Sequence, residues 1–441
     1  MTPTVYIKTF GCQMNEHDSQ RMLDLLADSG YLPAASPEEA SLIVVNTCSV
    51  RHNPENKVFS FLGTLREIKK RRPETVVAVA GCVAQQEGRH ILQREHLVDL
   101  VFGPDQMFRL PELVERVHAG ARVCATDWLP REGRTQNFIP EEWVERGHVE
   151  GFKAYTAIIK GCNNLCSFCI VPRTRGREVS REPDNILRDV RSLVLRGAKE
   201  IWLLGQNVNS YRAAEDYGFY ELLDAVSQID GLARLRFTSP HPKDWNNALS
   251  DLMASRPAVC KQLHLPFQAG SDPVLKAMRR RHTVVEYLEK VRYLRQAVPG
   301  VEISTDLIVG FPGETEENFE GTLSVLREVR FSQVFPFKYS PRPETAAAAL
   351  ADDVPRDAKE ARLARVIALQ EEINQSCQEA LVGTGQEVLI DGKHPRRSGW
   401  VNGRTDGYRA IAVKGGNMEA GDIVRARVTG HEGHWLVGES E

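Results

Sequence analysis

Short apolar runs alternate with amphipathic stretches along the first quarter of the chain. The apolar runs are predicted strands, at Val5–Thr9, Leu42–Asn46, Val76–Ala80 and Leu97–Phe102. Helical patterns separate them, at Asp18–Ser29, Glu55–Arg72 and Gln85–Arg94. Regular alternation of strand and helix is typical of a mostly parallel sheet covered by helices. The N-terminal part is therefore predicted to be an α/β domain.

The same alternation returns between Gly151 and about Ser340. The predicted strands are Ala154–Ile159, Glu200–Leu204, Leu232–Thr238, Gln262–Pro266, Val301–Val309 and Gln333–Tyr339. The helical patterns between them are Pro183–Arg196, Tyr220–Ile229, Asp244–Ala254, Val284–Ala297 and Glu316–Val329. Six strand–helix units predict a partial (β/α)6 barrel, whose active site belongs at the C-terminal ends of its strands.

A charged amphipathic stretch, Pro355–Ala380, follows the predicted barrel. We expect a helical strut between domains, with a partner-binding helix as the alternative. Beyond it, hydrophobic and polar residues alternate as in β-strands. The predicted strands are Gln386–Ile390, Gly399–Val401, Tyr408–Val413, Asp422–Val428 and Trp435–Gly438. Short strands separated by glycine-containing turns predict a small antiparallel β-barrel at the C-terminus.

These patterns divide the 441 residues into three domains, in line with the length of the chain. The predicted ranges are 1–120 for the N-terminal α/β domain, 121–150 for a linker, 151–380 for the barrel with its strut helix, and 381–441 for the C-terminal barrel. The linker is polar and rich in turn residues, with a possible strand near Arg122–Ala125.

The composition is that of a globular protein, with 42% hydrophobic and 26% charged residues. A net charge of −3 does not indicate nucleic acid binding, so any such function must depend on local basic patches. Nine cysteines scattered through a long chain do not suggest a secreted disulfide framework. We expect no signal peptide and no membrane span, and a cytoplasmic protein.

Three cysteines lie close together on a loop after the first strand of the predicted barrel. Cys162, Cys166 and Cys169 have the spacing C-x3-C-x2-C. Three thiolates on a four-iron cluster leave one iron open to a small molecule. The alternative, a zinc site, usually takes a fourth Cys or His in a paired C-x2-C arrangement, and the chain contains no second pair of this kind.

Three more cysteines follow the first three predicted strands. Cys12, Cys48 and Cys82 occupy the same position in successive strand–helix units. Parallel strands end at a common edge, where open α/β sheets bind ligands, so the three should meet in space. Gly11 and Gly81 precede two of them and would allow the backbone to come close to a bulky inorganic cluster. Core packing explains each cysteine singly, but the repeated position favours a second three-cysteine site. Cys124, Cys260 and Cys377 show no such pattern and are interpreted as structural.

Polar residues at other strand ends are candidate cofactor contacts: Gly205, Gln206, Asn207, Gln268 and Asp306. The C-terminal barrel also carries basic and aromatic residues: Lys393, Arg396, Arg397, Arg404, Arg409, Trp400 and Tyr408. Arginine and lysine for phosphates, with aromatic rings for stacking, are typical of an RNA-binding surface. A solvated basic face explains the charges almost as well.

Four motifs make the whole chain resemble the methylthiotransferases, a radical S-adenosylmethionine (SAM) family. They are Thr9–Asn15 (TFGCQMN), Asn46–Arg51 (NTCSVR), Gly205–Tyr211 (GQNVNSY) and Tyr339–Pro343 (YSPRP). In these motifs the chain is similar to the branch that acts on tRNA and converts N6-isopentenyladenosine, next to the anticodon, to its 2-methylthio derivative. One departure is Glu344, where the family pattern has glycine.

The resemblance implies an α/β cluster domain, a partial barrel and a C-terminal TRAM domain, with two [4Fe-4S] clusters. Cys162, Cys166 and Cys169 would hold the cluster that cleaves SAM, and Cys12, Cys48 and Cys82 an auxiliary cluster carrying the sulfur. Two SAM molecules would be used per turnover. The target C2–H bond of adenine is neither acidic nor electrophilic, so a primary carbon radical supplied by a cofactor suits the chemistry.

The resemblance also implies roles near the cysteine loop. Phe168 is expected near the SAM adenine, or in a core contact, and Arg173, Arg175 and Arg177 are expected to grip RNA phosphates or to lie solvated at the surface. Expected partners are a tRNA anticodon stem-loop, an electron donor such as flavodoxin or ferredoxin, and a sulfur- or cluster-delivery protein; the enzyme is expected to be a monomer.

Two alternatives remain at this point. The first keeps the chemistry and changes the substrate, to a ribosomal-protein aspartate or to threonylcarbamoyl-adenosine in tRNA, as in other branches of the family. The second is a non-catalytic iron–sulfur carrier or RNA-binding protein whose SAM site is idle, which would make no 5′-deoxyadenosine.

Overall fold

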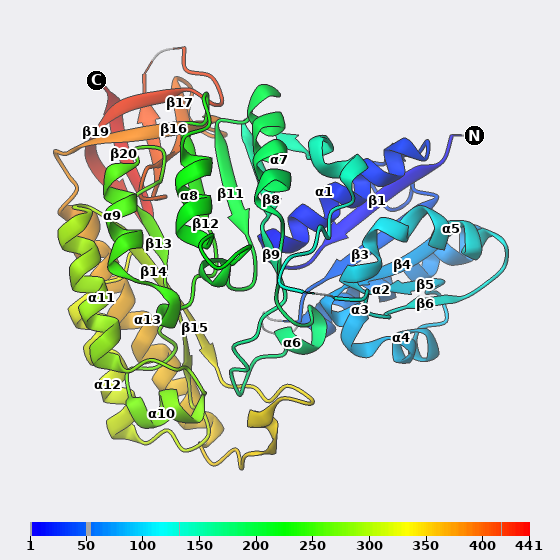
Figure 1. The fold of residues 1–441 in the computed structure, drawn as a ribbon, viewed down its shortest axis with the longest axis horizontal. Helices are drawn as coiled ribbons and strands as arrows, with labels where there is room; N and C mark the ends of the chain where they lie inside the picture. The colour runs from blue at the N-terminus through cyan, green and yellow to red at the C-terminus, as the bar shows by residue number, and fades with distance from the viewer. Residues whose placement is uncertain (1, 50–53, 132, 416) are drawn as a thin grey trace.

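The computed structural model describes residues 2–49, 54–131, 133–415 and 417–441. Three domains are visible (Figure 1): an N-terminal α/β domain in blue and cyan, a central domain in green and yellow, and a C-terminal barrel in orange and red. Within the described residues, no helix is both long and apolar enough to cross a membrane.

The N-terminal domain is built on one sheet of six strands in the order β2-β1-β3-β4-β5-β6, and all the pairs are parallel. The strands are β1 Thr4–Thr9, β2 Leu32–Pro33, β3 Leu42–Thr47, β4 Val76–Gly81, β5 Leu100–Phe102 and β6 Val123–Ala125. The helices are α1 Gln13–Asp28, α2 Pro54–Arg71, α3 Cys82–Glu87, α4 Arg89–Arg94 and α5 Leu110–His118, with the 3-10 turn η1 Pro104–Arg109. Separate apolar cores cover the two faces of the sheet, which explains why β3 and β4 are buried along their whole length. The predicted parallel sheet is confirmed.

Some boundaries differ from the prediction. Strand β6 pairs with β5, so the N-terminal sheet extends to Ala125, beyond the predicted boundary at residue 120. The helix expected at Gln85–Arg94 is two helices, α3 and α4, because Gly88 between them has φ 49° and interrupts the helical path. Helix α1 begins at Gln13, directly after Cys12, and not at Asp18.

The central domain is a partial barrel of six parallel strands in two sheets. They are β8 Lys153–Ala157, β11 Glu200–Leu204, β12 Arg234–Phe237, β13 Gln262–His264, β14 Glu302–Val309 and β15 Gln333–Lys338. An isolated parallel bridge links Leu235 on β12 to Val259, three residues before β13. The short strands are β7 Val149–Glu150, antiparallel to β8, and the antiparallel pair β9 Ile159–Lys160 and β10 Val179–Ser180. The predicted (β/α)6 architecture is confirmed.

Helices accompany the barrel strands. They are α6 Val171–Thr174, α7 Pro183–Leu195, α8 Phe219–Ser227, α9 Asn247–Ser255, α10 Asp272–Ala277, α11 Val284–Ala297 and α12 Glu316–Val329, with the 3-10 turns η2 Glu141–Arg146, η3 Val208–Ser210, η4 Pro242–Asp244 and η5 Ala346–Ala349. In α11 the Thr283 side chain accepts from the Glu286 N–H, and the Glu286 carboxylate accepts from the Thr283 N–H. This reciprocal cap is a signal of a helix start that is readable in the sequence.

Helix α13 (Arg356–Glu379) is the predicted strut and packs along the central domain. Val366 and Ile373 are buried in the barrel's apolar core. At the start of the helix Arg362 donates to the Glu314 carboxylate over 2.8 Å. The helix therefore extends the central domain and leads the chain to its last domain.

The C-terminal domain is a closed five-stranded barrel in the order β16-β17-β18-β20-β19. Its strands are β16 Gly385–Lys393, β17 Trp400–Thr405, β18 Ala410–Lys414, β19 Ile423–Glu432 and β20 Trp435–Ser440. All pairs are antiparallel except β18 with β20. Two buried arginines of β12 fasten it: Arg234 donates to the Arg404 carbonyl over 2.8 Å and Arg236 to the Asp406 carbonyl over 2.9 Å.

Candidate active site: two cysteine trios

The N-terminal trio (Cys12, Cys48 and Cys82) is assembled by three adjacent strands. Cys12 caps α1 after β1, Cys48 directly follows β3, and Cys82 begins α3 directly after β4. Because β1, β3 and β4 are neighbours in the sheet, their C-terminal ends bring the three thiols to one edge. The juxtaposition expected from the repeated position is present.

Two asparagines of the cysteine motifs lock this edge together. The Asn15 Nδ2 donates to Asn46 Oδ1 over 3.0 Å and to the Thr47 carbonyl over 2.9 Å. Asn46 Nδ2 donates back to the Asn15 carbonyl over 2.8 Å. Both asparagines are buried and cannot reach water, so these hydrogen bonds satisfy the polar groups of their side chains. Both residues belong to motifs recognised in the sequence, but their role in joining the strand ends was not predicted.

Gly81 is required at its position for two reasons. Its φ is +88°, which L side chains rarely adopt, and a Cβ there would overlap the Thr47 carbonyl on β3. The glycine therefore lets β4 deliver Cys82 close to β3. This close approach is between strands, which is a more local role than the approach to a cluster that the sequence suggested.

The Cys12 thiol is prepared to ionise. Its hydrogen bond with Cys48 lowers its pKa to about 6, although burial opposes the change. The charge of Arg175 and backbone N–H groups at the start of α1 act in the same direction. A thiol at a helix N-terminus beside a cation is the environment in which thiolates form near neutral pH. The N-terminal trio is thus suited to bind metal.

Arg175 reaches this trio from the central domain. Its side chain is buried, with 4% of the residue exposed, and Nε donates to Cys82 Sγ over 3.3 Å. Nη2 lies 2.8 Å from Asp18 Oδ2. Burial raises the pKa of the Asp18 carboxyl, but the charge of Arg175 and the contacts with His17 together outweigh burial and lower that pKa to about 2. A phosphate contact, as expected from the sequence, does not fit this buried placement.

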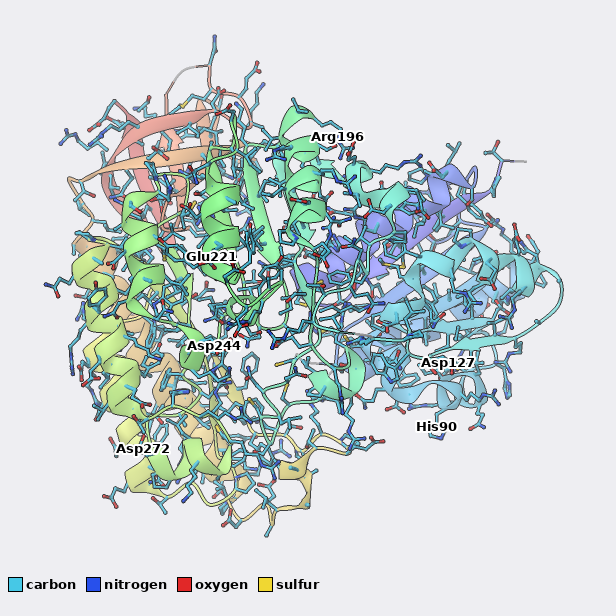
Figure 2. The ribbon with its side chains drawn as sticks, viewed as in Figure 1. His90, Asp127, Arg196, Glu221, Asp244 and Asp272 are labelled. Carbon is cyan, nitrogen blue, oxygen red and sulfur yellow. The ribbon has the colours of Figure 1, made fainter. Side chains whose placement is uncertain are left out.

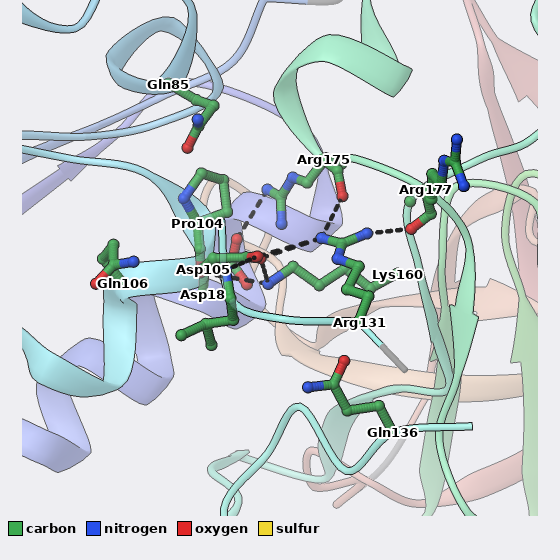
Figure 3. A network of polar contacts seen from close by, with 12 residues as sticks. Asp18, Gln85, Pro104, Asp105, Gln106, Arg131, Gln136, Lys160, Arg175 and Arg177 are labelled. Atoms are coloured by element: carbon green, nitrogen blue, oxygen red, sulfur yellow. Dashed lines mark hydrogen bonds and ion pairs between the residues drawn. The ribbon is translucent and has the colours of Figure 1, made fainter. Parts of the chain in front are cut away.

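A chain of ion pairs connects the loop of Arg175 with the N-terminal domain (Figure 3). Asp105 lies at its centre, paired with Lys160 and, over 3.2 Å, with Arg131. Arg131 also donates to the Arg175 carbonyl over 2.8 Å and to the Arg177 carbonyl. Lys160 lies two residues before Cys162 and Arg177 lies eight residues after Cys169, so these contacts hold both ends of the loop that carries Cys162, Cys166 and Cys169 against the N-terminal domain.

The central trio (Cys162, Cys166 and Cys169) lies on that loop, between β9 and α6. The three cysteines are partly exposed. The loop turns at Leu165, whose φ is +49°, and closes where the Cys169 N–H donates to the Cys166 carbonyl over 3.0 Å. Burial raises the pKa of the Cys162 thiol to about 11 and that of Cys169 to about 12. These thiols are therefore protonated until a metal displaces the protons.

Arg280 is the arginine of the central trio, and the sequence analysis missed it. Its Nη1 lies 3.5 Å from Cys166 Sγ and its Nη2 donates to the Pro266 carbonyl over 2.8 Å. The neighbours Arg279 and Arg281 both have positive φ, at 58° and 53°. The run of three arginines after α10 was the available signal.

The predicted cofactor residues that follow β11, Gly205, Gln206 and Asn207, lie close to the loop of the central trio or to its neighbours. The Gln206 Oε1 accepts from the Gly161 N–H over 2.5 Å, one residue before Cys162. A Cβ at Gly205 would overlap the Ile159 side chain, so glycine lets β11 pack against β9. The buried Asn207 donates to Asp244 Oδ2 over 3.1 Å, while its Oδ1 has no partner among the described residues. Asp244 lies near the middle of the molecule in Figure 2.

The other three predicted contacts lie nearby. Gln268 is buried with φ +70° and its N–H donates to the Asp306 carbonyl over 3.1 Å. Asp306 Oδ2 lies 3.3 Å from His264 Nε2 on β13. Phe168 packs against a small apolar cluster that includes Phe311 and Tyr339. The core contact expected as an alternative for Phe168 is therefore present.

The other predicted RNA-binding residues are more exposed. Arg173 and Arg177 flank Arg175 at the surface, and Arg173 pairs with Glu344 over 3.0 Å. Glu344 has φ +62°, a conformation that favours glycine, which accounts for the residue expected there from the family pattern. The last two residues of the motif Asn46–Arg51 lie outside the described residues.

The basic residues of the C-terminal barrel divide into two groups. Arg396 is exposed, and the Arg397 guanidinium lies 5.2 Å from the centre of the Trp400 ring. Arg404 lies over Tyr408 at 5.0 Å, beside the central domain. Arg409 pairs with Glu302 of the central domain. Arg404 and Arg409 therefore contribute to domain docking, and the exposed RNA-binding candidates are those near Arg396.

Within the described part of the chain, no three His, Cys, Asp or Glu side chains converge on a point where they could hold one metal ion. Two sets of three thiols fit a polynuclear iron–sulfur cluster better, since each cysteine then binds a different iron. The two arginines beside the trios supply N–H donors of the kind that surround cluster sulfurs. The donor sets therefore suit clusters.

Comparison with known families assigns all three domains. Residues 4–103 match the Uncharacterized protein family UPF0004, residues 156–326 the Radical SAM superfamily and residues 379–439 the TRAM domain.

Full-length relatives share one name, tRNA-2-methylthio-N(6)-dimethylallyladenosine synthase. The proteins of Geotalea uraniireducens and Aquifex aeolicus are 43% and 44% identical to this chain, over 99% and 100% of it and 98% and 99% of their own lengths. That of Syntrophobacter fumaroxidans is 46% identical over 99% of this chain and 95% of its own.

Solved structures show the same fold at low identity. The radical S-adenosylmethionine methyltransferase TsrM from Kitasatospora setae, solved with cobalamin and a [4Fe-4S] cluster, superposes with a TM-score of 0.56 at 16% identity, over 79% of this chain and 74% of its own. The cobalamin-dependent S-adenosylmethionine radical enzyme OxsB reaches 0.52 at 10% identity, over 84% of this chain and 56% of its own.

Proposed function

The chain belongs to the family of the tRNA-2-methylthio-N(6)-dimethylallyladenosine synthases, radical-SAM methylthiotransferases, and we propose how its residues carry out that reaction. The substrate is N6-dimethylallyladenosine (isopentenyladenosine) next to the anticodon of a tRNA. The enzyme adds sulfur and a methyl group at C2 and uses two SAM molecules per turnover.

One observation carries the assignment of the site: the loop of the central trio also delivers Arg175 to the N-terminal trio. Cys169 and Arg175 are separated by only the short helix α6. Two three-cysteine sites joined in this way lie on either side of the contact between the two domains. This suits a reaction in which a radical formed at one site and sulfur held at the other must meet on one substrate.

The central trio holds the cluster that serves SAM. Cys162, Cys166 and Cys169 would hold a four-iron cluster with one iron left without a protein ligand, and that group would supply the one-electron reduction that splits SAM into methionine and a carbon radical. The chain contributes the setting: Gln206 fixes the backbone at Gly161, and Arg280 donates toward Cys166. The raised pKa values of Cys162 and Cys169 mean that loading the cluster releases protons there.

The N-terminal trio holds a second four-iron cluster, which brings the total to two. Asn15 and Asn46 keep the strand ends of Cys12 and Cys48 in register, and Gly81 places Cys82 beside them. The lowered pKa of Cys12 favours thiolate ligation at neutral pH. The group held by these three ligands would supply the sulfur for insertion.

The tRNA binds across the central and C-terminal domains. Arg173 and Arg177 offer exposed charge next to the cysteine loop, and Arg396 with the Arg397–Trp400 pair offers charge and a ring on the TRAM barrel. An electron donor of the flavodoxin or ferredoxin type and a sulfur- or cluster-delivery protein complete the system, and the enzyme acts as a cytoplasmic monomer.

Iron counting tests the two-cluster assignment. The protein is reconstituted anaerobically with iron and sulfide, alongside a Cys162/Cys166/Cys169→Ala triple variant. About eight irons per chain should fall to about four in the variant, because each trio binds one four-iron cluster. About four falling to none would show that the N-terminal trio holds no cluster.

Nucleoside analysis tests the substrate. Mass spectrometry of tRNA from a deletion strain should show loss of 2-methylthio-N6-isopentenyladenosine and its return on complementation. Unchanged amounts of this nucleoside would contradict the assignment and favour the branch that acts on threonylcarbamoyl-adenosine or on a ribosomal protein.

A further inference from the structure

Arg175 is a buried cation with donors to spare, placed at the N-terminal trio. Its Nε–H donates to Cys82 Sγ over 3.3 Å. Nη2 is 2.8 Å from Asp18 Oδ2 but does not have hydrogen-bond geometry there, and this buried nitrogen has no hydrogen-bond partner among the described residues. Asp18 balances the charge of this group, and the N–H bonds of Nη2, buried beside three thiols, are donors that a sulfur acceptor held by the trio can use.

The loop that carries Arg175 belongs to the other cysteine site. The Arg175 carbonyl accepts from Arg131, which is paired with Asp105 of the N-terminal domain, and Asp105 also pairs with Lys160 at the start of the central cysteine loop. Figure 3 shows these groups converging between the two domains. The position of the guanidinium therefore depends on how the central loop is seated on the N-terminal sheet.

We propose that Arg175 is a positioning residue of the auxiliary cluster: it donates to Cys82 and to the cluster's sulfur, and it raises the cluster's reduction potential from within the loop of the SAM-cleaving site. This inference rests on the proposed second cluster at the N-terminal trio. Hydrogen bonds to cluster sulfurs and nearby positive charge stabilise the reduced form, which carries one more negative charge. The two iron–sulfur sites are thereby coupled through one short segment of chain.

The test isolates the auxiliary cluster. In the full chain with Cys162, Cys166 and Cys169 replaced by Ala, the remaining cluster is titrated anaerobically and followed by electron paramagnetic resonance and visible absorption. Arg175→Lys keeps the positive charge beside Asp18 but removes the planar Nε–H aimed at Cys82. Arg175→Gln removes the charge as well. Arg173→Lys and Arg173→Gln, two residues away at an exposed ion pair, are the matched controls.

At a fixed ambient potential, Arg175→Gln should reduce the ratio of reduced to oxidised cluster about tenfold relative to Arg173→Gln, a shift of about 59 mV to more negative potential for a one-electron couple. Arg175→Lys should shift the potential in the same direction by less and change the resonance spectrum, while Arg173→Lys should change neither. Since Arg175→Lys keeps a positive charge beside Asp18, the reduction potential can still be measured in this variant if Arg175→Gln fails to fold.

The inference is overturned if Arg175→Lys has the same potential and spectrum as Arg173→Lys. Failure of the underlying proposal looks different. If the triple-Ala background binds no iron, the auxiliary cluster itself is absent, whatever residue occupies position 175.

Discussion

The two cysteine trios differ in how the chain builds them. The central trio occupies eight consecutive residues on one loop, and burial raises the pKa values of its thiols at Cys162 and Cys169 although the charge of Arg280 opposes the change. The N-terminal trio is collected from three strand ends, and its Cys12 thiol has a lowered pKa. A loop yields a site whose geometry is local, whereas a sheet edge yields one whose geometry depends on strand register.

The arginines beside the trios differ in the same way. Arg175 is buried between Cys82 and the Asp18 carboxylate. Arg280 meets Cys166 and a carbonyl, and no ion pair of Arg280 is found in the part of the chain that the structure describes. The N-terminal site is thus the more strongly preorganised by charge.

Replacing the cysteines should distinguish the roles of the two trios most clearly. Replacing Cys12, Cys48 or Cys82 by Ala should abolish formation of methylthiolated nucleoside while 5′-deoxyadenosine is still produced, because the central cluster remains. Replacing Cys162, Cys166 or Cys169 should abolish both products. Anaerobic assays with liquid chromatography and mass spectrometry measure the two together. Methylthiolation that survives loss of Cys82 would remove the distinction between the sites.

Breaking the buried ion pair of the N-terminal trio should be costly. Asp18→Asn leaves the Arg175 charge buried without its partner, and we expect the free energy of unfolding to fall by about 3–5 kcal/mol. Urea denaturation of the metal-free protein, followed by circular dichroism, measures the shift of the midpoint. The matched control is Glu344→Gln at the exposed pair with Arg173, where the loss should be about 0–1 kcal/mol.

The same pair should show a defined pH dependence. The native pKa of Asp18 is about 2, below its ordinary value of 3.8, so its stabilising contribution is present above about pH 4 and is lost as the pH falls through about 2. Asp18→Asn removes this component of the acid sensitivity. Equal acid sensitivity of the wild type and the variant between these pH values would contradict the ion pair.

The thiols should also differ in reactivity in the reduced, metal-free protein. At pH 7 we expect iodoacetamide to modify Cys12 roughly 50-fold faster than Cys162, because Cys12, with a pKa of about 6, is mostly thiolate while Cys162, at about 11, is almost entirely protonated, and the weaker nucleophilicity of the less basic thiolate offsets only part of this difference. Peptide mass spectrometry over time gives both rates in one sample. The Cys12 rate should level off above pH 7 and the Cys162 rate should continue to rise. Equal rates at pH 7 would mean that burial, and not ionisation, controls access.

The smallest expected effect lies at the surface beside the central loop. Glu344→Gly should raise the free energy of unfolding by about 1 kcal/mol, because glycine adopts φ +62° without strain and the exposed pair with Arg173 contributes little. Urea unfolding compares it with Glu344→Ala, which keeps the strained backbone and loses the pair. A loss of stability in the glycine variant that matches the alanine variant would show that the pair outweighs the strain.

Much of the fold was predictable because its signals are local. Strand β11 and helices α11 and α12 have the predicted bounds, since each has a clear hydrophobic period and ends at turn residues or caps. The break between α3 and α4 and the pairing of β6 were missed. Gly88 signals only a weak break in the sequence, and whether three residues such as Val123–Ala125 join a sheet depends on the neighbouring strand.

In the candidate site, too, the features with local sequence signals were predicted and those that depend on tertiary contacts were not. Six cysteines at repeated or tightly spaced positions were recognisable from the chain itself, and the resemblance of four motifs to a known family indicated the reaction. The destination of Arg175 was not, because three arginines at alternate positions, Arg173, Arg175 and Arg177, look equivalent in sequence. Only packing of the loop against α1 and α3 buries one of them with Asp18 and leaves the other two exposed.

The sequence by itself determined the order of the domains, the two sets of thiols and the chemistry they imply, because these depend on periodicity and residue type. The tertiary structure decided which side chains serve the thiols. Asp18 and Cys82 are far from Arg175 along the chain, and only folding brings a charge, a carboxylate and a sulfur within bonding distance. Their interaction is strong because burial excludes the water that would otherwise screen it.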